Sequence, residues 1–111
     1  MKSNRQKGAY YLKKSLDELK KLGYQTTKLE TNKMTFIKGH MIFIHTDAFA
    51  SDILAMDDKE IIFIQVKFKE DGKFSNFNQW VDEFNKYKWP PFVKRELWLW
   101  EPRKKVRREI C

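Results

Sequence analysis

The sequence predicts one α/β domain in which a central mixed β-sheet is flanked by helices. Two segments have the hydrophobic spacing of amphipathic helices, and segments rich in β-favouring residues lie between and after them. One of these β-like segments is apolar along most of its length, which is typical of a central strand. The 111 residues contain no internal repeat, low-complexity segment or linker, so we expect a single domain over residues 1–111.

The first predicted helix covers residues 5–22. Leu12, Leu16 and Leu19 recur at i, i+4 and i+7, which places them on one face of a helix. Gly23 follows the last apolar position, where a glycine commonly ends a helix. We therefore expect the leucine face of this helix to pack on one side of the sheet.

Several β-like segments precede the second predicted helix. They cover residues 24–30, 34–37, 41–45, 52–56 and 60–68. Two of them flank Lys38-Gly39-His40, and two β-like runs around a short turn with a glycine predict a hairpin. Residues 47–51 are expected to form a loop or bend, and Asp57-Asp58-Lys59 is expected to form a turn.

The second predicted helix covers residues 75–88, and one more strand follows it over residues 94–101. Ser75 or Asn76 is expected to cap the helix, and Trp89-Pro90-Pro91 is expected to end it because proline cannot continue a helix. The apolar face of this helix is predicted to contain Phe77, Trp80, Val81, Phe84 and Tyr87.

The aromatic residues allow two interpretations. They could stack on unpaired bases, or they could form the core between the second helix and the sheet, which explains most of them better. This applies to Trp80, Trp89, Trp98 and Trp100. Phe74, Phe77 and Trp80 could likewise belong to the core or to a surface that binds a partner.

The chain is strongly basic. Lys and Arg number 23 against 15 Asp and Glu, which gives a net charge of +8. Such an excess on a small domain predicts a polyanionic partner, most simply nucleic acid. The clearest candidates for phosphate contacts lie after the last predicted strand, although they could also be solvated charges on a terminal strand, and Lys7 could extend their surface. They are Arg103, Lys104, Lys105, Arg107 and Arg108.

Other classes of protein do not fit the composition. One cysteine, at position 111, excludes a disulfide framework and a zinc site built on several cysteines, and we expect its thiol to be inert. His40 and His45 have no partner at a ligand spacing, so we expect no metal site there. No apolar run approaches the roughly 18 residues of a membrane helix, and the N-terminal residues lead into no signal-peptide core. We therefore expect an intracellular protein.

Three polar side chains are predicted to meet where two strands pair. If residues 52–56 and 60–68 form a hairpin, Asp52 lies opposite Gln65, and Gln65 and Lys67 point to the same face. A carboxylate and an amide oxygen are hard ligands that suit Mg²⁺ or Mn²⁺. A lysine beside them can stabilise charge on a reacting phosphate. These groups match the needs of phosphodiester hydrolysis, and Asp47 could add a carboxylate.

The same residues have a purely structural interpretation. Gln65 and Lys67 could mark the point where an apolar strand meets solvent, and Asp52 could cap a strand end. The spacing alone leaves both interpretations open.

The polar motif resembles that of a nuclease superfamily. Asp52-Ile53-Leu54-Ala55 followed by Ile64-Gln65-Val66-Lys67 resembles the core motif of the PD-(D/E)xK nucleases. Lys7-Gly8-Ala9-Tyr10-Tyr11-Leu12 is similar to the first helix of archaeal-type Holliday junction resolvases and their phage relatives. Residues 47–52 are similar to the Asp-x-Phe-x-x-Asp bend of phage-type members. The resemblance spans nearly the whole chain and implies a restriction-endonuclease-like domain.

By position, the resemblance implies roles for individual residues. Asp52 and Gln65 would bind Mg²⁺ or Mn²⁺ with the Val66 carbonyl, and Lys67 would be the catalytic lysine. Lys28 occupies a position where those proteins often carry a basic residue. The resemblance further implies an endonuclease that cuts branched DNA such as a four-way junction, acts as a homodimer, and works in a prokaryotic cytoplasm or a virus-infected cell.

Two positions depart from the family pattern. Gln65 replaces an acidic residue, and the glutamate that resolvases carry in their first helix falls at Leu12. The loss of two carboxylates favours an alternative, a binding module of the same fold that grips DNA without cutting it. A third hypothesis is a structural or interaction protein whose charge serves solubility.

Overall fold

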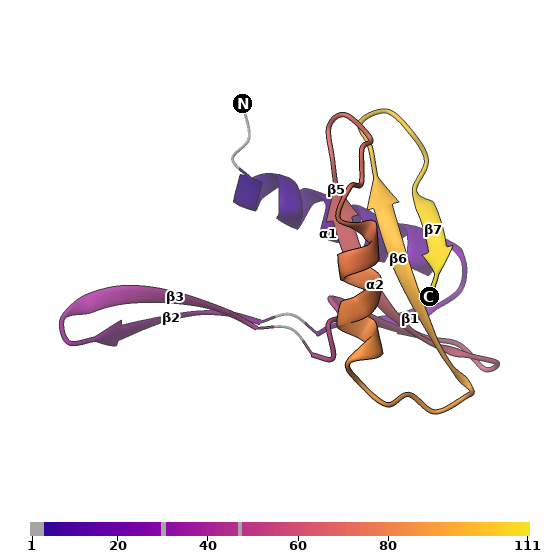
Figure 1. Ribbon diagram of the computed structural model, residues 1–111, viewed down its shortest axis with the longest axis horizontal. Helices are drawn as coiled ribbons and strands as arrows, with labels where there is room; N and C mark the ends of the chain where they lie inside the picture. Colours follow the sequence, from indigo (N-terminus) through magenta and orange to yellow (C-terminus); the bar gives the residue numbers. More distant parts are fainter. Residues whose placement is uncertain (1–3, 30, 47) are drawn as a thin grey trace.

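The protein is built on a five-stranded mixed sheet with one helix on each face (Figure 1). The computed structural model describes residues 4–29, 31–46 and 48–111. The strand order in the sheet is β1 (Gln25–Lys28), β4 (Ile53–Met56), β5 (Ile61–Phe68), β6 (Val93–Trp100) and β7 (Arg107–Ile110). Helices α1 (Asn4–Lys21) and α2 (Phe77–Asn85) cover the two faces. The predicted architecture is therefore confirmed.

The centre of the sheet is a parallel pair, and its other pairs are antiparallel. β5 and β6 run parallel, so the chain must cross over between them, and α2 supplies that crossover. In the antiparallel pair of β4 and β5, Ile53 lies opposite Ile64. This is the register that the sequence predicted, because it continues toward Asp52 and Gln65.

The helix α2 is shorter than the predicted 75–88. It begins at Phe77, and the side chain of Asn76 at the capping position makes no capping hydrogen bond. It ends at Asn85 because the following residues turn back on it. The N–H of Tyr87 and the indole N–H of Trp89 both donate to the Phe84 carbonyl, at 3.2 Å and 2.8 Å.

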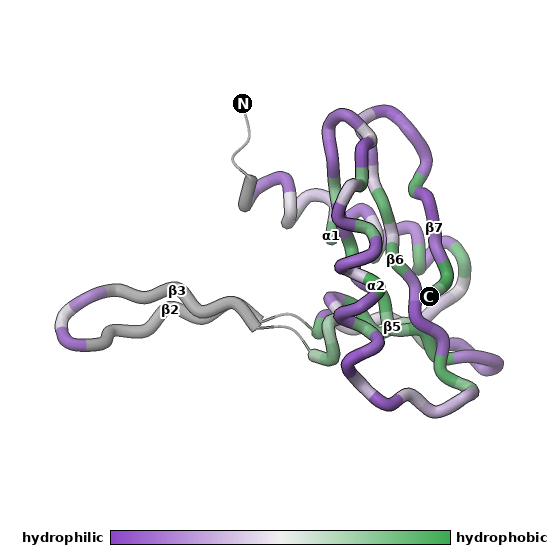
Figure 2. Tube along the Cα trace, in the orientation of Figure 1, coloured by the Kyte–Doolittle hydropathy of each residue, from purple (hydrophilic) through white to green (hydrophobic). Residues whose placement is uncertain are grey.

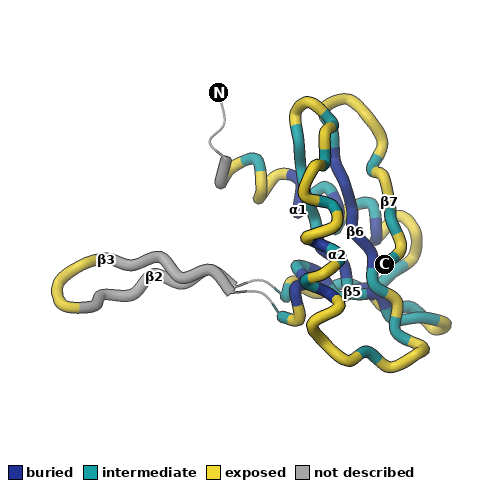
Figure 3. The backbone as a smooth tube through the Cα atoms, viewed as in Figure 1, coloured by how far each residue is buried: buried dark blue, intermediate teal, exposed yellow. Residues whose placement is uncertain are grey.

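Each face of the sheet has its own apolar cluster, because alternate strand residues point to opposite faces. The predicted leucine face of α1 packs on one side, where Leu12 and Leu19 are buried with Ile62 and Ile64. On the other side, residues of α2 pack against β6. Trp80 and Phe84 of α2 are buried there with Leu97 and Leu99 of β6. Figures 2 and 3 show these apolar and buried segments concentrated on the inner strands.

The tryptophans are core residues, but they do not all pack under the second helix. Trp80 and Trp89 belong to the α2 side, with Phe74 and Phe77 packed against the same cluster. Trp98 and Trp100 lie on the opposite face, under α1. The expectation that α2 accounts for most of the tryptophans was therefore wrong for this pair, because positions 98 and 100 alternate with the α2-facing Leu97 and Leu99.

A separate hairpin extends away from the sheet (Figure 1). It is formed by β2 (Thr31–Ile37) and β3 (His40–Thr46). Its turn has positive φ at both central residues, 52° at Lys38 and 79° at Gly39, which is the conformation that matches the twist of a two-residue hairpin. The predicted hairpin is confirmed, with strands that reach further than expected. In the described part of the chain, no helix has the length and apolar character needed to cross a bilayer.

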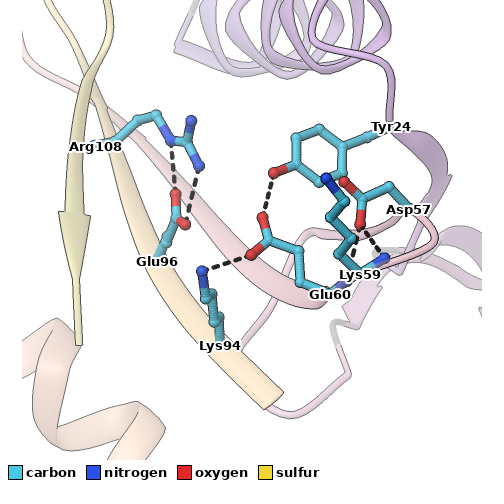
Figure 4. A network of polar contacts seen from close by, with 7 residues as sticks. All are labelled: Tyr24, Asp57, Lys59, Glu60, Lys94, Glu96 and Arg108. Carbon is cyan, nitrogen blue, oxygen red and sulfur yellow. Dashed lines mark hydrogen bonds and ion pairs between the residues drawn. The ribbon is translucent and has the colours of Figure 1, made fainter. Parts of the chain in front are cut away.

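The basic C-terminal segment is partly a strand. Arg107–Ile110 form the edge strand β7, which pairs antiparallel with β6. Arg108 makes two hydrogen bonds to the carboxylate of Glu96, at 2.7 Å and 3.0 Å, and Glu96 is only 3% exposed (Figure 4). The indole N–H of Trp98 donates to the same carboxylate at 3.0 Å. The edge strand is therefore fastened to β6 by a buried charge as well as by backbone bonds.

A second polar network joins the connection between α1 and β1 to the segments where β5 and β6 begin (Figure 4). The Tyr24 hydroxyl donates to Glu60, and the Lys94 ammonium lies 2.5 Å from the other carboxylate oxygen of Glu60. Asp57 accepts the backbone N–H groups of Lys59 and Glu60, both at 2.8 Å, and so forms the predicted turn. The hydrogen bond from Lys94 is the main cause that lowers the pKa of Glu60, and the hydrogen bond from the Lys59 N–H is the main cause for Asp57.

These lowered pKa values predict acid-sensitive stability. A carboxyl group with a lowered pKa in the folded state stabilises the protein above its ordinary pKa, and this stabilisation is lost as the pH falls through the folded value. For Glu60 the ordinary pKa is 4.5. We expect the free energy of unfolding to fall below that pH, and to fall less steeply in Lys94→Met. Urea unfolding of both proteins between pH 7 and pH 3 measures this, and identical pH dependences would contradict it.

Candidate active site

Asp52 lies where the chain enters β4, and three hydrogen bonds hold it there. Its N–H donates to the Ile64 carbonyl, and its own carbonyl accepts the Leu29 N–H, both at 2.8 Å. Its carboxylate oxygen Oδ2 accepts the N–H of Val66 at 2.8 Å. Asp52 is therefore fixed beside the segment of β5 that contains Gln65, as the predicted pairing requires.

A strained turn precedes Asp52. The backbone N–H groups and carbonyls of Ala48 and Ser51 face each other across it, and Phe49 and Ala50 have φ values of 53° and 57°. Residues other than glycine adopt this conformation at a cost of roughly 1–2 kcal/mol each. The Phe49 ring is 54% exposed and makes an edge contact with Tyr87, with ring centroids 5.5 Å apart. The turn directs the chain into β4. Asp47, the predicted extra carboxylate, lies outside the described residues.

Gln65 is buried with one half of its amide unsatisfied. It is 3% exposed, and its Nε2 donates to Oε2 of Glu83 at 3.1 Å. No described residue donates a hydrogen bond to its Oε1. A buried amide oxygen without a donor costs free energy unless something else binds it. This oxygen therefore marks a position where a cation would be stabilised.

Lys67 points to the same side of β5 as Gln65, as the alternation of the strand predicts. Its ammonium lies 5.1 Å from the ring centre of Trp80 in α2. The face of an indole attracts a cation, so Trp80 restricts the position of the lysine without neutralising it. The two polar side chains of the motif are thus both held by residues of α2.

Glu83 is the site residue that the sequence did not indicate. It lies three residues after Trp80, so the two side chains lie on the same face of α2, and it contacts Gln65. In the sequence, only the position of Glu83 beside the apolar face of α2 could have indicated that its side chain lies near the sheet. Leu12, by contrast, is a residue of α1 that is buried in the core between this helix and the sheet, so the first helix supplies no carboxylate at the position where resolvases carry glutamate.

The donor atoms fit a hard divalent cation. They are the Asp52 carboxylate, Gln65 Oε1 and the Val66 carbonyl, with Glu83 beside Gln65. The N–H and C=O of one strand residue point to the same side, so the Val66 carbonyl faces the edge where Asp52 lies. Over the described residues, no three His, Cys, Asp or Glu side chains gather into a metal-binding group. A metal here would therefore depend on amide and backbone oxygens as well as carboxylates.

The predicted phosphate-binding residues lie in three different parts of the structure. Lys28 is exposed on β1 opposite Ile53, next to Asp52. Lys7 forms an ion pair with Glu70 and lies 5.9 Å from the Phe68 ring centre. The C-terminal cations lie beyond β6, at the opposite edge of the sheet.

The C-terminal cations differ in their partners. Lys104 pairs with Glu101 at 3.2 Å, Arg107 with Glu109 at 2.5 Å, and Arg108 with Glu96. Arg103 and Lys105 are exposed, and neither forms an ion pair with a described residue.

The remaining predicted residues are on β3 and after β7. His40 is exposed at the start of β3, and His45 lies in the same strand. Cys111 follows β7, and burial raises the pKa of its thiol.

Solved structures share this fold. No protein-family model matches the sequence. No curated protein matches it either. The Holliday junction resolvase Hjc of Archaeoglobus fulgidus is similar with a TM-score of 0.52 and 19% identity, over 88% of this chain and 74% of that one. The protein SSO0001 is similar with a TM-score of 0.51 and 19% identity, over 89% of this chain and 48% of that one. The fold expected from the resemblance is therefore confirmed.

Proposed function

We propose that this chain, which has the fold of an archaeal resolvase, is a metal-dependent endonuclease that cuts branched DNA such as a four-way junction. The observation that carries the proposal is the buried, unsatisfied Gln65 Oε1 beside Asp52 and Lys67. The oxygen of a buried side-chain amide normally accepts a hydrogen bond from the protein. Here a carboxylate and a lysine flank it, which are the groups that phosphodiester hydrolysis needs.

The chain's own residues would divide the work as follows. Asp52, Gln65 and the Val66 carbonyl would hold Mg²⁺ or Mn²⁺, with the Val66 N–H fixing the carboxylate of Asp52. When bound, the metal would lower the pKa of water and neutralise phosphate charge. Lys67, held over Trp80, would stabilise the negative charge that develops on the scissile phosphate. Lys28 would contact the neighbouring backbone of the DNA.

Branched DNA also motivates a proposed homodimer. Two copies related by a twofold axis would present two such sites to two strands, which is the symmetry of a four-way junction. Light scattering at several concentrations, with and without a junction, measures the number of copies directly.

The proposal is tested by incubating the purified protein with labelled four-way junction, duplex and single-stranded DNA. Each substrate is incubated with Mg²⁺, with Mn²⁺ and with EDTA. Cutting of the junction that requires a metal is the expected result. Tight binding without cutting in either metal would instead support the second candidate, a DNA-binding module of this fold, which Leu12 and Gln65 favour.

Gln65→Glu is expected to bind Mn²⁺ roughly tenfold more tightly than the wild type, because ligand charge controls affinity for hard cations. The new carboxylate would also lie beside Glu83, and two like charges in a buried site repel. The metal-free variant should therefore be less stable than the wild type, and Mn²⁺ should restore its stability. Calorimetric titration and thermal unfolding measure the two effects.

The matched control for this variant is Gln65→Glu combined with Glu83→Gln, which restores the original number of charges. We expect it to regain stability without metal. Unchanged Mn²⁺ affinity in Gln65→Glu would contradict the placement of a metal at this residue.

A further inference from the structure

A groove of about 660 Å³ lies between the second half of α1 and the connection from β6 to β7. Trp100, Leu22 and Val106 contribute its apolar lining. Six cationic side chains surround it, against two acidic ones, Asp17 and Glu18. The cations are Lys14, Lys21, Arg103, Lys104, Lys105 and Arg108. The groove therefore carries an excess of positive charge around an open hollow.

The cations of the groove are not equally engaged inside the protein. Arg108 and Lys104 have the carboxylate partners described above. Lys14 lies 4.9 Å from the ring centre of Trp100, which holds its ammonium inside the groove. Counting only residues that the structure describes, Lys21, Arg103 and Lys105 have no ion-pair partner. Their charge is available to an external anion.

The groove and the candidate active site lie on opposite faces of the sheet. Trp100 of the groove belongs to the core on the α1 side, whereas Gln65 and Lys67 contact residues of α2. They also lie toward opposite edges, because the sheet order places β5 and β6 between β4 and β7. Nucleic acid at Asp52 and nucleic acid in the groove would therefore approach the protein from opposite faces of the sheet.

We propose that the groove binds the phosphate backbone of a second nucleic-acid segment, separate from the one at Asp52. Several cations spaced along an open hollow suit a repeating anion, and backbone contacts of this kind position a nucleic acid without reading its sequence. A partner with two arms that diverge from one point satisfies both surfaces. The inference rests on the proposed function. It adds that the protein would prefer branched DNA to a linear duplex because branched DNA can occupy both surfaces.

The test uses the variant Lys21→Ala, Arg103→Ala, Lys105→Ala in EDTA, so that binding is measured apart from cutting. Fluorescence anisotropy gives the affinity for a four-way junction and for a short linear duplex over a range of salt concentrations. The slope of log affinity against log salt for the junction is expected to become shallower by about 2.7, since each lost phosphate contact contributes about 0.9. The duplex, which occupies one surface only, should lose less affinity than the junction.

The matched control removes three exposed lysines elsewhere, in Lys59→Ala, Lys86→Ala, Lys88→Ala. It has the same net charge as the groove variant, and thermal unfolding establishes that both are folded. A groove variant that loses no more junction affinity than this control would overturn the proposal, as would equal losses for junction and duplex. Groove-dependent binding of polyglutamate but not of DNA would also overturn it and assign the groove to an acidic protein. Absence of metal-dependent cutting would contradict the proposed function. It would not affect the test of the groove, because binding is measured in EDTA.

Discussion

Lys67→Ala is expected to slow metal-dependent cutting of a four-way junction by about 100-fold or more, because one group that stabilises charge in the transition state contributes that much. Affinity for the junction in EDTA should change by less than about twofold, since one phosphate contact among many contributes little to binding. The reason for the difference lies in the site. Lys67 lies two residues after Gln65, on the same face of β5, and its ammonium lies over the ring of Trp80.

Single-turnover cutting with excess protein measures the Lys67 effect, because product release then does not limit the rate. Lys73→Ala is the matched control, since Lys73 is an exposed lysine in the connection from β5 to α2. It should cut at the wild-type rate. A Lys67→Ala variant that still cuts normally would show that the lysine is structural and would move the chemistry to other residues.

Arg108→Ala is expected to lower the free energy of unfolding by about 2 kcal/mol, because it leaves a buried carboxylate without its charged partner. Glu96 would keep only the indole N–H of Trp98 as a side-chain donor among the described residues. The variant would also free β7 from its side-chain attachment to β6. Urea unfolding at neutral pH measures the loss.

The neighbouring residue provides the matched control for Arg108. Arg107→Ala removes the same side chain from the same strand, but its partner Glu109 is much more exposed than Glu96. Exposed ion pairs typically contribute less than about 1 kcal/mol, so this variant should remain close to the wild type. Equal losses in the two variants would show that strand pairing, and not the buried charge, holds β7 in place.

Much of this fold could be predicted because its strongest signals are local. The leucine spacing predicted α1, and the apolar run with its turn predicted the pairing of β4 with β5 and hence the position of Asp52 beside Gln65. Alternation along β5 then placed Gln65 and Lys67 on one face. Each of these steps depends on residues close together in the chain.

What the sequence could not show depends on contacts between distant segments. Glu83 joins Gln65 only because α2 crosses β5, and the side of the sheet that receives Trp98 depends on which helix covers it. The same holds for Arg108. The sequence predicted a phosphate-binding surface cation, but the pairing of β7 with β6 brings its guanidinium to Glu96. Periodicity places a side chain on a face of its element but does not name the partner across from it.

The two outer strands of the sheet have a consequence for association. β1 and β7 are four residues each and are mostly polar, because Gln25–Lys28 has no apolar side chain and Arg107–Ile110 has one, Ile110. Short, charged edges resist the addition of further strands and so protect a sheet from aggregation. We therefore expect β1 and β7 to remain the outer strands of the sheet when copies of the protein associate. A second copy would have to associate through helices or loops rather than by extending the sheet.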